Sequence, residues 1–140
     1  LHYPLRRQRQ MCIRDSSKTK QFRKGLDQLD EEGVVQVLRD QDAPTASPVL
    51  GAVGQMQFEV FAHRLEYEFG SKVEMSPTSW VVARRTDEKT AEKVRELRGT
   101  RVLGSLDGTL FALFDSTGRL TRTMNDNPDW VLERVVETVG

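Results

Sequence analysis

The sequence predicts an α+β fold in which helices pack on a mixed, largely antiparallel sheet. Short runs of β-branched and other apolar residues, such as residues 34–39 and 110–114, predict buried strands. Two longer segments, residues 18–32 and 55–69, carry apolar residues at the spacing of one helix face. Because these helices and short strands interleave, a sheet covered by helices on one face is the expected architecture.

The first predicted helix, residues 18–32, precedes a predicted hairpin. Phe22, Leu26 and Leu29 form its narrow apolar stripe, and Gly33 ends it. The strands of the hairpin are residues 34–39 and 48–53, and a polar turn with one proline joins them.

Residues 48–70 form the central strand–turn–helix of the prediction. Gly51 and Gly54 bracket a tight turn, the helix runs over residues 55–69, and Gly70 stops it. Five apolar residues fall on one stripe of this helix and predict its core face. They are Phe58, Phe61, Ala62, Leu65 and Phe69.

Strands and helices continue to alternate in the C-terminal half. Thr86 is the expected N-cap of one helix, and Asp115 or Ser116 caps the last one. Residues 99–108 predict no definite element. We expect strands at residues 71–76, 80–84, 110–114 and 130–136, and helices at residues 86–98 and 116–125.

Length and charge are consistent with one domain over residues 18–140. The 140-residue chain has no formal net charge, but residues 1–20 carry six Lys/Arg and one Asp, whereas residues 21–140 carry fifteen Lys/Arg and twenty Asp/Glu. The mildly acidic domain argues against nucleic-acid binding through bulk charge. No apolar run of membrane-spanning length or secretory leader is visible, so we expect a cytoplasmic protein with no membrane partner.

Residues 1–17 are predicted to be a disordered or non-native arm, because they show no usable period. Residues 11–16, MCIRDS, resemble translated adaptor sequence, which should be left out of fold reasoning. The alternative is a basic arm that folds on RNA. Cys12 is the single cysteine of the chain, so an intrachain disulfide is excluded.

The helix over residues 55–69 has a second apolar face. Met56, Val60, His63 and Tyr67 lie about 180° from the core stripe on a helical wheel of 100° per residue. Trp80, Trp130 or a chain end could cover this face within the domain. Alternatively, the face meets another domain or protein.

The sequence predicts no catalytic, cofactor-binding or metal site. It contains no phosphate-binding GxxxxGK[ST] loop, GxSxG, HExxH or paired CxxC motif. His63 is interpreted as a surface or interface residue, because no cluster of cysteines or carboxylates accompanies it. Arg119 and Arg122, with no acidic neighbour expected before Asp126, are the favoured phosphate contacts, and Arg84 and Arg85 are further candidates.

Two motifs resemble the C-terminal, third domain of the bacterial peptide-chain release factor three family, which belongs to the translational GTPases. The first, FxxGLxQLxEEG, is matched over residues 22–33; the second, VGAVGxLQFxVxxxRLxxEY, is matched over most of residues 49–69, with Met56 in place of Leu. The resemblance covers residues 18–140 and weakens after Arg85.

This resemblance implies a ribosome-docking and coupling domain of a GTPase that promotes dissociation of codon-reading release factors after peptide release. Its implied partners are the small ribosomal subunit, both protein and RNA, and the GTPase and β-barrel domains of the same protein. GTP and Mg would bind outside these residues, so this fragment itself is not expected to be an enzyme. The alternative is an independent protein-interaction module that uses the second apolar face.

Overall fold

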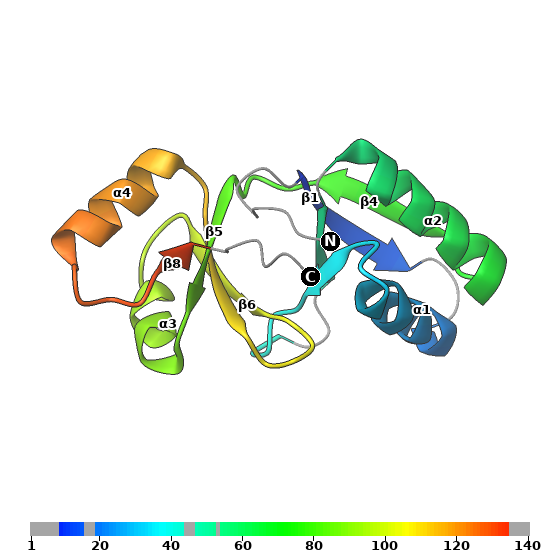
Figure 1. Ribbon diagram of the computed structural model, residues 1–140, viewed down its shortest axis with the longest axis horizontal. Coiled ribbons are helices and arrows are strands. Elements are labelled where there is room, and N and C mark those ends of the chain that lie inside the picture. The colour runs from blue at the N-terminus through cyan, green and yellow to red at the C-terminus, as the bar shows by residue number, and fades with distance from the viewer. Residues whose placement is uncertain (1–8, 16–18, 44–46, 53, 135–140) are drawn as a thin grey trace.

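A computed structural model describes residues 9–15, 19–43, 47–52 and 54–134 (Figure 1). It confirms the α+β class. None of the helices among the described residues has the length and hydropathy needed to cross a membrane. In chain order the elements are β1 (Arg9–Asp15), α1 (Thr19–Glu31), β2 (Gln36–Leu38), β3 (Val49–Ala52), α2 (Gln55–Phe69), β4 (Val73–Pro77), β5 (Val82–Thr86), α3 (Glu88–Val94), β6 (Thr100–Gly104), β7 (Leu110–Phe114), α4 (Thr117–Asp126) and β8 (Glu133–Arg134).

The described strands form two four-stranded sheets instead of the single sheet that the sequence suggests. Sheet A has the order β2-β3-β1-β4 and sheet B the order β6-β7-β5-β8, and all neighbouring strands are antiparallel. Helices α1 and α2 lie at one end of the molecule beyond sheet A, and α3 and α4 lie at the other end beyond sheet B (Figure 1). The two sheets therefore form the middle of a four-layer arrangement.

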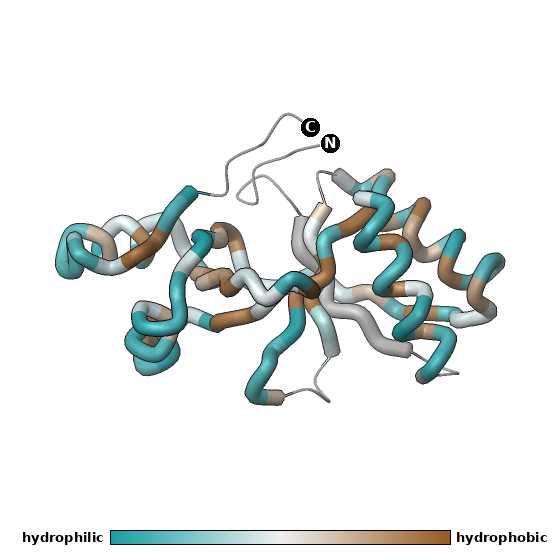
Figure 2. The backbone as a smooth tube through the Cα atoms, turned by 60° about the horizontal axis from the view of Figure 1, so that its bottom comes forward, coloured by the Kyte–Doolittle hydropathy of each residue, from teal (hydrophilic) through white to brown (hydrophobic). Residues whose placement is uncertain are grey.

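Strand β7 shows why the apolar run over residues 110–114 is continuous. Its residues alternate between two buried faces, as the two-residue period of a strand requires. Leu110, Ala112 and Phe114 pack with residues of α3 and α4, whereas Phe111 and Leu113 pack with Leu38 and Val49 of sheet A. The backbone coloured by hydropathy shows hydrophobic stretches concentrated in these central strands (Figure 2).

The segment after β2 links the two sheets. The backbone N–H of Arg39 donates to the carbonyl of Gly104 at 2.8 Å, and the N–H of Gly104 donates back at 2.7 Å. Asp40 also contacts Arg101 of β6 at 3.4 Å, and Asp42 contacts Arg95 at 3.3 Å. These contacts join one end of sheet A to one end of sheet B.

Strand β1 contradicts the expectation of a disordered arm for residues 9–15. Arg9–Asp15 lies inside sheet A, where it pairs with β3 on one side and with β4 on the other. A strand at this position joins β3 and β4, which do not pair with each other. The other residues of the predicted arm lie outside the described residues, and its non-native origin stays a prediction.

Most other boundaries lie close to their predicted places. The β2–β3 hairpin is confirmed, and α2 has the predicted bounds. The expected N-cap Thr86 is wrong: Thr86 ends β5, and Asp87 caps α3 by accepting a 2.7 Å hydrogen bond from the N–H of Thr90. Helix α3 ends at Val94, a turn over residues 95–99 follows, and Thr100–Gly104 then form β6, which the sequence did not predict.

Candidate docking surface

The inner face of α2 is the packing side of this helix. Phe58, Phe61 and Leu65 are fully buried against α1 and sheet A. Gly25 of α1 permits this close approach, because a Cβ atom there would lie 2.3 Å from Cδ1 of Leu65. The predicted core stripe of α2 is therefore confirmed at these three positions.

The opposite side of α2, which we call the outer face (Met56, Val60, His63 and Tyr67), is open to solvent. Met56 is 70% exposed, Val60 41% and Tyr67 72%. The ring of exposed His63 lies against that of Tyr67, with centroids 4.4 Å apart and planes tilted by 39°. An exposed aromatic pair beside two aliphatic side chains is typical of an interaction surface.

The two tryptophans do not cover the outer face. Trp80 packs against the cluster between the two sheets, and Trp130 packs against the cluster beneath α3 and α4. Lys93 also lies over the ring of Trp130, with its Nζ 5.9 Å from the centroid. Both tryptophan side chains are thus engaged elsewhere. The chain ends, the other predicted cover, lie outside the described residues, so an outside partner for Val60 and Tyr67 stays a prediction.

The ends of α2 are well defined. The N–H of Gly54, the N-cap residue, donates to Oε1 of Gln57 at 3.2 Å. This is the hydrogen bond from the N-cap backbone to the N3 side chain that occurs in a capping box. At the other end Gly70 adopts a left-handed conformation with φ of 67°, and its N–H donates to Glu66 O at 3.0 Å. The outer face therefore sits on a helix whose start and end are each marked by a local hydrogen bond.

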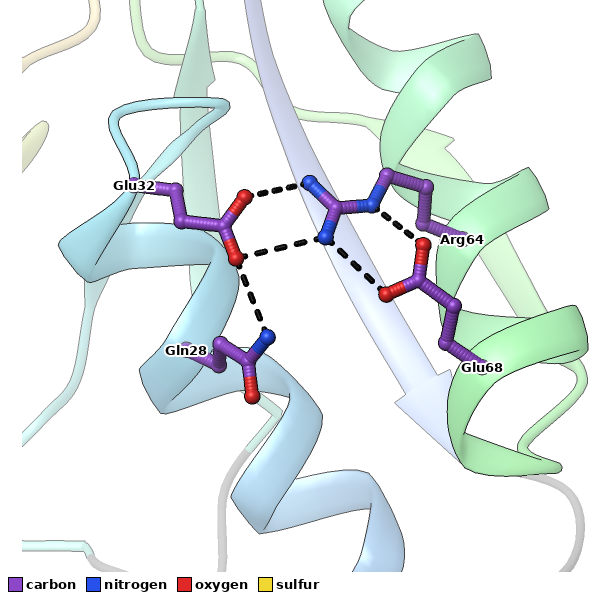
Figure 3. Close-up of polar contacts among 4 residues, drawn as sticks. All are labelled: Gln28, Glu32, Arg64 and Glu68. Atoms are coloured by element: carbon purple, nitrogen blue, oxygen red, sulfur yellow. Dashed lines mark hydrogen bonds and ion pairs between the residues drawn. The ribbon is translucent and has the colours of Figure 1, made fainter.

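A charged network on the flank of the outer face joins α2 to α1 (Figure 3). Arg64 donates to Glu32, the residue after α1, at 2.5 Å and to Glu68 at 2.6 Å. Gln28 of α1 also donates to Glu32 at 3.0 Å. These hydrogen bonds from Arg64 lower the pKa of Glu32 and of Glu68 below their ordinary values. The network stabilises the charged forms and holds α2 in one position against α1.

The structure places the four arginines predicted to contact phosphate on two elements, one pair on β5 and the other on α4. Arg84 and Arg85 are neighbours in β5, so their side chains leave opposite faces of sheet B. The expectation that Arg119 has no acidic neighbour is wrong, because its Nε donates to Oδ1 of Asp115 at 2.8 Å. Arg122 lies one turn further along α4 than Arg119, on the same side.

A pocket of about 440 Å³ lies between the segment after α3 and helix α4. Its lining includes a third arginine, Arg98. Arg98 stands three residues after Arg95, but the two do not share a helix face because α3 ends at Val94. Arg95 contacts Asp42, whereas Arg98 lies with Arg119 and Arg122. The residues that line the pocket are Leu97, Arg98, Ser116, Gly118, Arg119, Arg122, Thr123, Asp126 and Asn127.

A second basic cluster, on α1, was also missed. Lys20, Arg23 and Lys24 line a shallow depression together with Asp27. Their i, i+3, i+4 spacing was the available signal. Among the described residues, no group of three His, Cys, Asp or Glu side chains is placed to hold a metal ion.

Comparison with known proteins points to one family. A family model described as "Class II release factor RF3, C-terminal domain" matches residues 7–124, a range that includes β1. The chain is 34% identical over 127 residues to a protein of Symbiobacterium thermophilum named Peptide chain release factor 3, covering 89% of this chain and 24% of the relative. A protein of the same name from Synechococcus elongatus is 37% identical over 121 residues, covering 85% and 22%. The chain thus spans about a quarter or less of the length of these relatives.

Proposed function

Because this chain belongs to the family of the C-terminal domain of class II release factor RF3, we propose that it is the docking and coupling domain of a peptide chain release factor that acts in translation termination. The longer protein would be a cytoplasmic GTPase that promotes dissociation of codon-reading release factors. Its GTP and Mg sites would lie in another domain. In this proposal the domain binds the ribosome and a neighbouring domain and does no chemistry itself. The family match is the observation that supports the proposal.

In this proposal, the outer face of α2 packs on a neighbouring domain of the same protein, such as a β-barrel. The support is the exposure of Met56, Val60 and Tyr67, together with the small share of the relatives that this chain covers. Interfaces between domains of one chain bury about 600–1,500 Å² and allow relative motion. Met56, Val60 and Tyr67, with His63 beside them, would therefore form the apolar part of a larger contact.

A rigid α2 is what coupling requires. Arg64 ties the helix to α1, and Gly25 brings the two helices into close contact. A force applied to the outer face would therefore move α1, α2 and sheet A together, because packed elements are not continuously deformable. A nucleotide-driven change in the neighbouring domain would shift this whole domain relative to the ribosome.

The proposed ribosomal partners are protein and RNA of the small subunit. Arg119 and Arg122 are the favoured contacts, since both are exposed on α4. Arg85 is exposed on β5 and Arg84 is half-buried beside it, so these two would reach different surfaces. Arginine contacts to RNA phosphate position a protein without reading sequence.

The test uses the full-length protein that carries this domain. Its binding to ribosomes is measured by co-sedimentation with GDP and with a non-hydrolysable GTP analogue. We expect binding that depends on the nucleotide, and the substitutions Met56→Ser, Val60→Ser and Tyr67→Ser together should weaken it about tenfold, or about 1.4 kcal/mol. Small-angle scattering should show a larger radius of gyration as the domain detaches.

The matched control replaces Leu106 and Met124 by Ser, because both are also exposed apolar residues but lie outside the outer face. This control should bind ribosomes like the unmodified protein. Absence of ribosome binding in both nucleotide states would reject the proposal and favour the alternative, an independent module whose outer face binds an unrelated protein. If the triple substitution changes neither ribosome binding nor scattering, the outer face does not hold this domain to a neighbour.

A further inference from the structure

The pocket between the end of α3 and α4 has three arginines in its lining. Arg98 comes from the turn before β6, and Arg119 and Arg122 come from α4. We propose that this arginine pocket (Arg98, Arg119 and Arg122) binds a phosphodiester group of RNA. The choice of RNA rests on the proposed function, whereas the anion site itself rests on the geometry of these residues.

Arg119 is held in place before any ligand arrives. Its Nε donates to Oδ1 of Asp115, and the guanidinium lies directly over the backbone of Gly99. A Cβ atom on Gly99 would be 2.4 Å from Nε of Arg119 and 2.5 Å from Oδ2 of Asp115. Gly99 also has φ of +70°, which favours glycine. The local backbone thus makes room for this ion pair, and a guanidinium held by its Nε keeps its two terminal nitrogens for another acceptor.

Arg98 and Arg122 carry the uncompensated charge of the pocket. Among the described residues neither has an ion-pair partner, whereas Arg39, Arg64, Arg95, Arg101 and Arg119 all do. Asp126 is the carboxylate in the described lining. Within the described part of the chain, Arg98 and Arg122 are thus two unpaired positive charges beside the paired Arg119, and a bound anion would compensate them.

The rest of the lining favours a phosphate over an acidic protein segment. Ser116 supplies an exposed hydroxyl, a side-chain type that accompanies arginine at nucleic-acid backbones. The hydroxyl of Thr123 and the amide nitrogen of Asn127 already donate to the carbonyls of Arg119 and Thr123. A protein partner would need a buried apolar anchor, as interface hot spots do. Leu97 is the large apolar side chain of the described lining and it is already half-buried. A phosphodiester needs charge and donors, which the arginine pocket has.

Titration of this chain with a single-stranded RNA decamer of uridine, followed by NMR, tests the assignment. We expect the backbone amides and Nε signals of Arg98, Arg119 and Arg122 to shift on binding. The logarithm of affinity should fall with the logarithm of salt concentration, with a slope of about 0.7 for each phosphate contact. Replacing Arg98 and Arg122 by Gln should lower that slope by about 1.4 and the affinity roughly tenfold at low salt.

The matched control replaces Arg23 and Arg134 by Gln, since both are exposed arginines outside the pocket and the loss of charge is the same. It should retain RNA binding. Equal loss in both double variants would show that overall charge drives binding and would overturn the pocket assignment, as would an absence of shifts in the three arginines. Inorganic phosphate that competes with the RNA at equal concentration would overturn the assignment to RNA. A failure here would remove Arg119 and Arg122 as RNA contacts. Nucleotide-dependent ribosome binding by the full-length protein is measured separately, so it would still support the proposed function.

Discussion

The two faces of α2 carry similar residue types and have opposite surroundings. Phe58, Phe61 and Leu65 point into a core made by α1 and sheet A, whereas Val60 and Tyr67 meet no described residue that covers them. Hydrophobicity alone does not separate these faces. The inner face holds the domain together, and the outer face is exposed among the described residues, so substitutions on the two faces should affect different measurements.

Phe61→Ala should produce the largest loss of stability. Removing a fully buried phenyl ring loses its transfer free energy and leaves a cavity, at a cost of about 3–5 kcal/mol. Urea unfolding of this chain, followed by circular dichroism, measures the free energy of unfolding. A loss below about 1 kcal/mol would mean that the inner face is not the packing side and would remove the contrast between the two faces.

Gly25→Ala tests how closely the inner face packs. The added methyl group would lie 2.3 Å from Cδ1 of Leu65 and 3.0 Å from the ring of Phe69. Crowding of this kind costs about 1–3 kcal/mol, against a helix-propensity gain of up to about 1 kcal/mol. We expect a lower urea midpoint. The matched control is Gly118→Ala in α4, where a Cβ meets no atom within 4 Å and the urea midpoint should rise. Stabilisation of both variants would show that α1 and α2 are not tightly packed.

Asp30 of α1 should make the free energy of unfolding depend on pH. Burial raises the pKa of Asp30 to about 6 from 3.8, although its carboxylate accepts a 3.4 Å hydrogen bond from the N–H of Val37. A raised pKa means that the folded state binds the proton more tightly, so this contribution to stability grows as pH falls from about 6 to about 4. Asp30→Asn should raise the free energy of unfolding by about 1 kcal/mol at pH 8, after allowance for the partial exposure of Asp30, and by little at pH 4. If Asp30→Asn raised the free energy of unfolding equally at both pH values, burial of the ionised carboxylate would not be the cause.

Substitutions on the outer face should change the free energy of unfolding least. Tyr67→Ala and Val60→Ser each remove exposed apolar surface, and changes at such positions usually fall within about 0.5 kcal/mol. Urea unfolding of this chain should therefore hardly change. A loss above about 1 kcal/mol would show that a part of this chain covers the outer face, and the face would then belong to the core.

Local residue patterns predicted most of the elements. Gly70 marks the end of α2 because a left-handed C-terminal residue follows from the helix geometry itself, and Ser116 caps α4 by accepting from the N–H of Arg119 at 3.0 Å. Strand β6 was missed because Arg101 interrupts a short apolar run between two glycines. Strand β1 was missed because its partners, β3 and β4, lie more than thirty residues further along the chain and its own residues show no alternation.

The candidate sites were predictable to different degrees. The outer face of α2 was visible in the sequence because helical periodicity relates residues of one element. Arg98 joins Arg119 and Arg122 only because α3 ends at Val94 and the chain turns towards α4. Spacing within one helix cannot relate residues that belong to two elements.

The sequence by itself determined the family, through two packing motifs, and the existence of two apolar faces on α2. Only the tertiary structure decided which face is covered, that the strands divide into two sheets with a shared core, and that three arginines surround one pocket. The reason is physical: periodicity follows from the geometry of one helix or strand. Burial and the convergence of charges depend on which distant elements pack together, and those contacts join residues far apart in the chain.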